Sequence, residues 1–297
     1  MTFDFLRYVD DYGVDYVTES GNLSRNWLLA MNCPFCSSDT KYKLGVPAGG
    51  NRSYCWACGG HSLFDTLKIL TPDISYGTLM KEYGDEYSYV QRITIEHAQT
   101  LAFPFPPLTA PAERYLLRRG FDLAILADKY NLKWGGVVGD FAYRIIIPIY
   151  HKGVLVSYQG RSISKAEGVA RYKTLDVWKS LVDPKSVLFN LDNCRDDWVV
   201  VVEGAFNVFR FGDGSCASLG TSFTDEQVHL LADYKRVIIM FDCEESAQKK
   251  ACSLAERVSA FGVQNVEVID MEFEGDKDLA ECTEDEILEI KRELKIL

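Results

Sequence analysis

The chain has 297 residues, 47% of them hydrophobic, and a formal net charge of −11. This length and apolar content predict about two globular domains, and no apolar run approaches the ~18 residues that a membrane span needs. The nine cysteines are odd in number and unevenly spaced, which argues against the disulfide framework of a secreted protein. Because the first residues also lack the basic-then-apolar order of a signal peptide, we expect a cytoplasmic protein without a membrane partner.

The charge is distributed unevenly along the chain. Residues 112–185 contain 13 basic and 7 acidic side chains, whereas residues 224–297 contain 9 basic and 19 acidic ones. The acidic total therefore does not exclude a nucleic-acid-binding surface in the middle of the chain. Two ordinary solvated surfaces explain the same counts, so charge alone does not decide between these interpretations.

Four of the cysteines form two closely spaced pairs. They are Cys33-Pro-Phe-Cys36 and Cys55-Trp-Ala-Cys58, separated by 18 residues. A two-residue spacer lets two thiolates reach one ion, and four thiolates close a tetrahedral Zn²⁺ site. We therefore predict one structural zinc ion in a zinc ribbon spanning residues 1–70, where it holds the domain folded. A redox-active pair or four core cysteines would be the alternative, but two matched pairs seldom arise by accident.

Aromatic side chains alternate with the second cysteine pair. Tyr54 and Trp56 flank Cys55, and Arg52 lies close by in the sequence. Exposed aromatic rings beside cations can stack on the bases of single-stranded nucleic acid. The same rings can equally cover a zinc core, and the sequence leaves these two roles open.

The middle of the chain is predicted to contain a linker and a basic domain. Residues 71–111 are expected to form a partly helical linker that ends in an extended segment, because prolines cluster near its end. Residues 112–190 are expected to form a basic α+β domain. Its two clearest strands are Arg144–Tyr150 and Val154–Tyr158, joined by a short turn.

Apolar strands alternate with helices in the last part of the chain. The expected strands are Trp198–Val202, 215–219, 237–241 and 266–269. Nearly continuous apolar strands between helices indicate a mostly parallel sheet that is covered on both faces. We therefore expect residues 191–297 to form a Rossmann-like α/β domain with a short C-terminal helix.

Acidic residues follow three of these strands. Glu203 comes directly after the first, Asp242 and Glu244 follow the third, and a segment with Asp276 and Asp278 follows the last. In parallel sheets, sites form where the carboxyl ends of strands meet. Carboxylates gathered there repel one another unless a cation is bound, and Mg²⁺ prefers such oxygen ligands. Each carboxylate alone could instead cap the helix that follows, but their repetition favours a metal site.

These residues together resemble a known family. Glu203-Gly204, Asp242-x-Glu244 and Asp276-x-Asp278 resemble the Toprim pattern of topoisomerases and primases. Further segments are similar to the primase zinc ribbon and to the basic region around Toprim, namely Cys55–Asp65, Arg144–Tyr150, Gln159–Arg161, Arg171–Lys173 and Ala217–Ser222. Most of the chain, except residues 71–111, therefore resembles DNA primases of the DnaG and phage type, in the same domain order.

The resemblance implies a DNA-directed RNA polymerase that makes short primers on single-stranded DNA from ribonucleoside triphosphates. It implies a bacterial or phage-infected cell, a replicative helicase as partner, and a zinc ribbon that helps to choose the initiation site. One to three Mg²⁺ or Mn²⁺ ions would be held by Glu203, Asp242, Glu244 and Asp278, with Asp276 in support. By the same resemblance, Arg161, Arg171 and Lys173 would contact the template or the nucleotide phosphates. We also expect nucleic acid or nucleotide to be bound by Arg118, Arg119, Arg144, Tyr54 and Trp56.

The sequence departs from the family pattern at two positions. Asn207 stands where the family usually has an aspartate, and Glu244 replaces a second aspartate, which bears on the geometry and number of bound metals. Because few residues follow the Toprim segment, we expect that the helical helicase-binding domain of bacterial primases is missing. This favours a phage or plasmid primase, or a shortened chain. A Toprim nuclease and a non-catalytic single-stranded DNA-binding module are the alternatives, whereas a topoisomerase would need a large gate domain.

Overall fold

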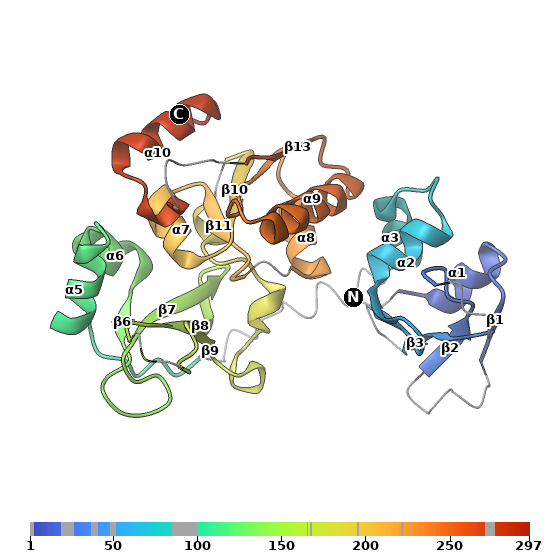
Figure 1. The fold of residues 1–297 in the computed structure, drawn as a ribbon, viewed down its shortest axis with the longest axis horizontal. Coiled ribbons are helices and arrows are strands. Elements are labelled where there is room, and N and C mark those ends of the chain that lie inside the picture. Colours follow the sequence, from blue (N-terminus) through green and yellow to red (C-terminus); the bar gives the residue numbers. More distant parts are fainter. Residues whose placement is uncertain are drawn as a thin grey trace. The chain divides into compact units, whose positions relative to one another are not determined.

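The computed structural model describes residues 3–18, 27–36, 41–47, 52–84, 100–164, 166, 168–194, 196–220, 223–270 and 277–297. The chain divides into two compact units, which Figure 1 shows in blue to cyan and in green to red. The first comprises Met1–Thr94 with Ala260–Gly262, and the second comprises Ile95–Ser259 and Val263–Leu297. Among the helices in the described ranges, none is long and apolar enough to cross a membrane.

The first unit is an antiparallel sheet with short helices packed against it. The strands follow one another across the sheet in chain order: β1 (Tyr16–Val17), β2 (Trp27–Met31), β3 (Leu44–Pro47), β4 (Arg52–Cys55) and β5 (Gly59–Ser62). The helices are α1 (Phe5–Asp11), α2 (Leu63–Leu70) and α3 (Tyr76–Tyr83). Its core joins the apolar faces of these elements and is rich in aromatic rings, among them Phe5, Tyr8 and Tyr83. The fold agrees with the expected ribbon.

Residues 71–111, expected from their composition to be a linker, contribute to both units. Helix α3 begins after its N-cap Ser75 and buries Leu79 and Tyr83 in the core of the first unit. Phe103 and Phe105 instead pack against Tyr158 in the second unit. The difference arises because apolar residues at every second position give even a proline-rich extended segment one face to bury.

The basic part of the second unit is built on an antiparallel sheet. The order is β6 (Lys133–Trp134), β7 (Arg144–His151), β8 (Val154–Ser162) and β9 (Tyr172–Thr174), preceded by helices α5 (Ala110–Arg118) and α6 (Leu123–Tyr130). Lys152 and Gly153 join β7 to β8 with φ values of 50° and 77°. Two positive φ values in a two-residue turn match the right-handed twist of a hairpin, so the expected hairpin is confirmed. Short 3₁₀ turns follow: η1 (Val177–Lys179), η2 (Pro184–Ser186) and η3 (Leu191–Asn193).

The remainder of the second unit is a parallel sheet with helices on both faces. The strand order is β11 (Ser215–Ala217), β10 (Trp198–Val202), β12 (Arg236–Ile239) and β13 (Asn265–Val268), and all three pairings are parallel. In Figure 1, helices α7 (Ala205–Phe211) and α10 (Glu284–Glu293) cover one face, and α8 (Asp225–Leu231) and α9 (Glu245–Ala260) the other. This is the α/β architecture that the sequence predicts.

Burial and capping explain why these strands and helices form where they do. Val199 to Val202 in the central strand β10 have no exposed surface, as covering on both sides requires. Helices α8 and α10 begin with complete capping boxes, in which Thr224 and Thr283 bond reciprocally with the residue three positions on. Strand β10 ends at Val202, and Glu203 lies where the chain leaves the sheet.

Candidate zinc site and catalytic pocket

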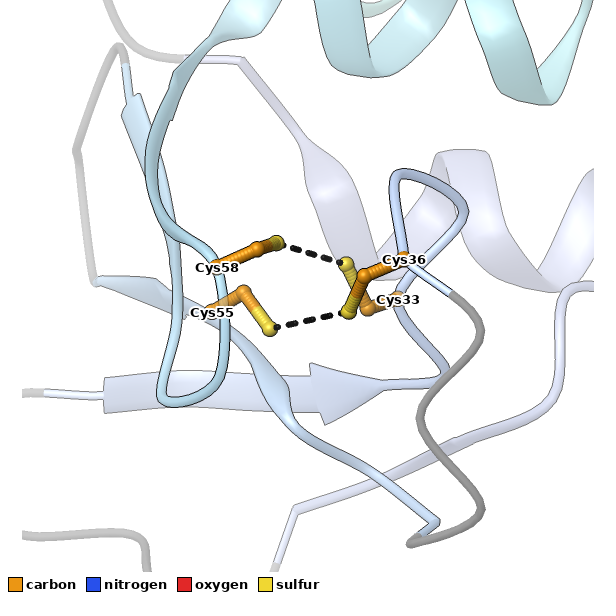
Figure 2. A group of neighbouring side chains, drawn as sticks. All are labelled: Cys33, Cys36, Cys55 and Cys58. Carbon is orange, nitrogen blue, oxygen red and sulfur yellow. Dashed lines mark hydrogen bonds between the residues drawn. The ribbon is translucent and has the colours of Figure 1, made fainter.

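The four paired cysteines of the first unit converge on one point (Figure 2). The Sγ atoms of Cys33 and Cys58 are 3.6 Å apart, and those of Cys36 and Cys55 are 3.8 Å apart. All four lie within 4.8 Å of one another. Zn–S bonds of ~2.3 Å in a tetrahedron place sulfur atoms ~3.8 Å apart, whereas a disulfide bond is only ~2.05 Å long. The geometry and the soft donor set therefore indicate a structural zinc site.

The electrostatics of the cluster also favour a bound cation. Cys58 is exposed, but desolvation within the cluster and the other three thiols raise its pKa well above the ordinary value. At Cys55, burial opposes ionisation, but hydrogen bonds from the backbone amides of Ala57 and Cys58 prevail and lower the pKa to about 7. A divalent cation removes the penalty on the remaining thiolates. Burial likewise raises the pKa of Cys33, so a bound cation would favour the ionised forms of both Cys33 and Cys58.

His61 supports the cluster from outside the tetrad. Its Nε2 atom lies 3.2 Å from Cys58 Sγ, and its ring stacks on Phe35 with centroids 3.6 Å apart. Both contacts orient the imidazole toward the sulfur rather than toward a fifth ligand position. Such outer contacts fix the direction of a metal ligand.

Two tryptophans lie beside the cluster on the surface of the sheet. Trp27 and Trp56 meet edge to face at 5.3 Å, over Gly45 in β3. A Cβ atom at Gly45 would lie 2.5 Å from the Trp56 ring and 2.8 Å from the Trp27 ring, so only glycine leaves room for both. Trp56 is 36% exposed and Tyr54 is 46% exposed. The rings of Trp56 and Tyr54 are thus accessible to a ligand, as stacking on nucleic-acid bases requires.

In the second unit, two strand ends bring carboxylates together. Strand β10 runs into Glu203, and the parallel strand β12 leads through Met240 to Asp242. The backbone amide of Asp242 donates a hydrogen bond of 3.1 Å to Oε1 of Glu203. The turn at Ser218–Gly220 fixes this strand end, because the Gly220 amide donates to the carbonyl of Glu203 at 2.8 Å. The expected convergence of Glu203 and Asp242 is therefore present.

The environment of these two carboxylates opposes their ionisation. Burial raises the pKa of Glu203 to about 7, and the neighbouring Asp242 adds to the rise. Burial and the nearby Asp278 likewise raise the pKa of Asp242, while a hydrogen bond from Asn207 lowers it. Neither group finds a paired cation strong enough to offset its burial. A divalent ion would supply that charge.

The other acidic candidates differ in position. Asp278 begins the 3₁₀ turn η4 (Leu279–Glu281) and faces the same pocket. Glu244 lies at the start of α9, exposed, and is close enough to raise the pKa of both Glu203 and Asp242. Asp276 lies outside the described residues. Asn207 is 9% exposed, and its bond to Asp242 puts a neutral donor where the family pattern has a third carboxylate.

The carboxylates line a pocket that is also lined by cationic side chains. The pocket has a volume of about 290 Å³ and includes Glu203, Asp242 and Asp278. Three arginines also line it: Arg119, Arg161 and Arg171. Arg171 is near enough to Asp242 to lower the pKa of that carboxyl group, against the rise caused by burial. Acidic and basic side chains in one pocket suit a ligand that carries both a metal ion and phosphates.

The remaining basic candidates are not among the pocket-lining residues. Arg118 is exposed at the end of α5, and Lys173 lies over the ring of Phe141 at 5.3 Å. Arg144 is only 7% exposed, and its guanidinium donates to the carbonyls of Gly160 and Ala170 at 3.1 and 2.9 Å. Its donors are used within the protein. The geometry therefore favours a structural role for Arg144, in which it holds the chain that leads to Arg171, over direct contact with nucleic acid.

The pocket carboxylates fit a divalent cation. Oδ1 of Asp278 is buried and has no hydrogen-bond partner in the described parts of the chain, and an orphaned buried oxygen is costly unless something binds it. Within those parts, only the four cysteines bring three or more ligand atoms within 4.8 Å of one another. The carboxylates are thus too widely spaced to enclose an ion alone. This suits Mg²⁺, which usually keeps waters and substrate phosphates in its coordination sphere.

The raised pKa of Glu203 predicts a pH-dependent effect of metal on stability. In the metal-free protein, the raised pKa of Glu203 lowers stability progressively as the pH rises from 4.5, the ordinary value, to about 7, and the loss is complete above that. Mg²⁺ binds the ionised form, so we expect it to raise the melting temperature more at about pH 8 than at about pH 6. Thermal unfolding with and without Mg²⁺ at both pH values checks this. Equal shifts in the wild-type chain would contradict it.

Two pocket-region residues were not predicted from the sequence. Phe206 lines the pocket from the first turn of α7, and Tyr115 contacts Arg161 from α5. Both are apolar enough to be assigned to a core by sequence. A signal was present for Tyr115, because it lies four residues before Arg119 and therefore on the same helical face.

Comparison with known proteins agrees with this geometry. Residues 200–283 match the Toprim-like family. The chain is 26% identical over 310 residues to the DNA primase of Aquifex aeolicus, an alignment that covers 84% of this chain and 60% of that primase. It covers smaller shares of two other curated DNA primases, 18% and 23%. The chain thus spans less than two thirds of the length of the curated relatives it matches.

Solved structures extend the match to the whole chain. The zinc-binding and RNA polymerase domains of the Aquifex aeolicus primase align with 98% of this chain and 81% of that one, at a TM-score of 0.53 and 23% identity. A DnaG primase catalytic domain bound to single-stranded DNA aligns with 66% of this chain and 74% of that one, at a TM-score of 0.52 and 19% identity.

Fold and sites together define a class of protein, one that joins a four-cysteine zinc ribbon to a Toprim-containing α/β unit. Within that class, the sequence matches relate the chain to DNA primases. The fold class expected from the sequence is confirmed.

Proposed function

We propose that the chain is a DNA primase, which makes short RNA primers on single-stranded DNA from ribonucleoside triphosphates. The observation that carries this proposal is the single pocket lined by the carboxylates Glu203 and Asp242 and by Arg161. A nucleotide bound with Mg²⁺ matches both kinds of charge. The relationship to DNA primases in sequence and fold supports the same activity.

The proposed reaction is a nucleotidyl transfer. The 3′-hydroxyl oxygen of one nucleotide attacks the α-phosphorus of the next, a new phosphodiester bond forms, and the bond to pyrophosphate breaks. Glu203, Asp242 and Asp278 would hold Mg²⁺, which lowers the cost of the developing alkoxide and of the leaving pyrophosphate. The pocket arginines would bind the triphosphate and hold it in line with the attacking oxygen.

The first unit would act on the template. Tyr54 and Trp56 are exposed beside the zinc site, and aromatic rings bind successive bases of a single strand by stacking. We propose that the zinc ribbon selects the initiation site in this way. A replicative helicase as partner and a bacterial or phage-infected cell as the setting belong to the same proposal, on the basis of the relatives' class.

Arg161→Ala is expected to weaken nucleotide affinity by about 10- to 100-fold, because it removes charge-assisted hydrogen bonds to phosphate. The affinity of the variant should also depend less on salt concentration, because it has lost one ionic contact with phosphate that salt would screen. Titration of the chain with MgATP at several NaCl concentrations measures both effects. Unchanged affinity with an unchanged salt slope would assign Arg161 to a structural role.

One assay separates the proposed function from its alternatives. The chain is incubated with single-stranded DNA, the four ribonucleotides and Mg²⁺, and the products are resolved on a denaturing gel. Short RNA that depends on the template supports a primase. Degraded DNA would indicate a Toprim nuclease instead, and DNA binding without either product would indicate a binding module.

A further inference from the structure

The guanidinium of Arg161 is held by three aromatic residues. The hydroxyl of Tyr115 accepts hydrogen bonds from Nε at 3.2 Å and from Nη2 at 3.0 Å. The ring centroids of Tyr172 and Phe206 lie 4.8 and 5.1 Å from the guanidinium carbon. As a result, Arg161 is only 6% exposed although it lines the pocket.

The residues of this cradle come from four different elements. Arg161 belongs to β8, Tyr115 to α5, Tyr172 to β9 and Phe206 to α7. Phe206 lies three residues after Glu203, and its ring also carries the guanidinium of Arg119 at 5.5 Å. Two of the three pocket arginines therefore rest on one ring of α7. This arrangement ties the positions of Arg119 and Arg161 to the helix that follows Glu203.

Tyr115 differs from the other two rings in its position. Tyr172 and Phe206 line the pocket, whereas Tyr115 is not among its described lining residues and contacts Arg161 from behind. A guanidinium has five N–H donors in one plane. Two of them bond to the hydroxyl oxygen of Tyr115, and Arg161 is also hydrogen-bonded to Tyr172. Together with the two ring contacts, these bonds restrain the guanidinium plane, so the other donors keep a fixed direction. A donor set held in place before binding loses less entropy when an anion arrives.

We propose that Tyr115 is a positioning residue for nucleotide binding, which acts by holding the plane of Arg161 toward the triphosphate. This inference rests on the proposed function, because it takes the phosphates of a nucleotide as the ligand of Arg161. Tyr115 itself makes no contact with the nucleotide. Its hydroxyl oxygen, rather than its ring, carries the effect.

The test is the binding of MgATP to the full chain, measured by isothermal titration calorimetry. Tyr115→Phe keeps the ring and removes the oxygen, and is expected to weaken binding about 10-fold. Tyr150→Phe is the matched control, because the Tyr150 hydroxyl also accepts a side-chain hydrogen bond, from Asn131 at 3.0 Å, in the same unit but outside the pocket lining. Binding by this control should equal wild type.

A double mutant shows whether Tyr115 acts through Arg161. If it does, adding Tyr115→Phe to Arg161→Ala causes no further loss of MgATP affinity. A second, full loss in the double mutant, or wild-type affinity in Tyr115→Phe, would overturn this inference and leave the proposed function standing. Failure of the wild-type chain to bind MgATP at all would instead contradict the proposed function, and this role with it.

Discussion

Glu203→Gln is expected to abolish primer synthesis, with a loss of a hundred-fold or more in kcat, while binding of single-stranded DNA persists. The substitution removes the negative charge next to Asp242 but keeps the shape of the side chain. The amide oxygen of glutamine can still accept the backbone hydrogen bond that Asp242 donates to Glu203. The change therefore tests metal binding rather than folding. Synthesis is measured by incorporation of labelled ribonucleotides, and DNA binding by fluorescence anisotropy.

Stability separates this effect from damage to the fold. Burial already holds the pKa of Glu203 at about 7, so a neutral side chain at this position relieves a cost at higher pH. We expect the metal-free variant to melt at or above the wild-type temperature. Glu289→Gln is the control, because Glu289 is exposed on α10 and does not line the pocket. Near-wild-type synthesis by Glu203→Gln would refute the role of Glu203 as a metal ligand.

Cys58→Ser is expected to release zinc and unfold the first unit. The Cys58 side chain is exposed, so its replacement costs little in packing, and the effect must come through the metal. A structural zinc site contributes on the order of 10 kcal/mol or more to a small domain, which is comparable to the whole stability of most domains. Elemental analysis measures the loss of zinc. Limited proteolysis of the full chain, followed at cleavage sites within residues 1–84, measures the unfolding of the first unit.

The matched control is Cys252→Ser, which removes another exposed cysteine, in α9 of the second unit and outside the cluster. This variant should keep one zinc ion per chain and the wild-type cleavage pattern. The second unit has its own hydrophobic core, so its melting transition should survive in Cys58→Ser. A zinc-depleted first unit that resists protease as the wild type does would contradict a structural role for the metal.

The convergence of the candidate metal ligands was the part of the molecule that the sequence predicted best. Two Cys-x-x-Cys pairs need only the local chain to present their thiols, and the carboxylates Glu203 and Asp242 follow from the parallel order of two apolar strands. In both cases a short-range pattern determines where the side chains lie. The same holds for the hairpin turn at Lys152–Gly153.

The basic residues were harder to assign, because their roles depend on what lies across the sheet. Arg144 belongs to a basic segment, which by sequence suggests contact with phosphate. It is buried because Gly160, on the neighbouring strand β8, has no side chain: a Cβ atom there would lie 2.9 Å from Arg144 Cδ. The tertiary pairing of β7 with β8, rather than the charge of the segment, decides that this arginine bonds to backbone carbonyls.

The sequence shows that Asn207 departs from the family pattern, but it does not show how Asn207 affects the neighbouring carboxylates. The structure places its amide against Asp242, where it donates a hydrogen bond to the carboxylate. A family aspartate at this position would add a negative charge to a pocket that already contains Glu203, Asp242 and Asp278. The amide instead stabilises the ionised form of Asp242 without adding charge. Such pairing depends on the first turn of α7 facing the end of β12.

We infer that carboxylates from separate strands share a divalent ion in the pocket. Anomalous diffraction from crystals grown with Mn²⁺ and a non-hydrolysable ribonucleotide would locate that ion. We expect a Mn²⁺ peak between Glu203, Asp242 and Asp278, within about 2.3 Å of carboxylate and phosphate oxygens. Nucleotide bound in the pocket with no such peak, or Mn²⁺ found only elsewhere, would contradict the account.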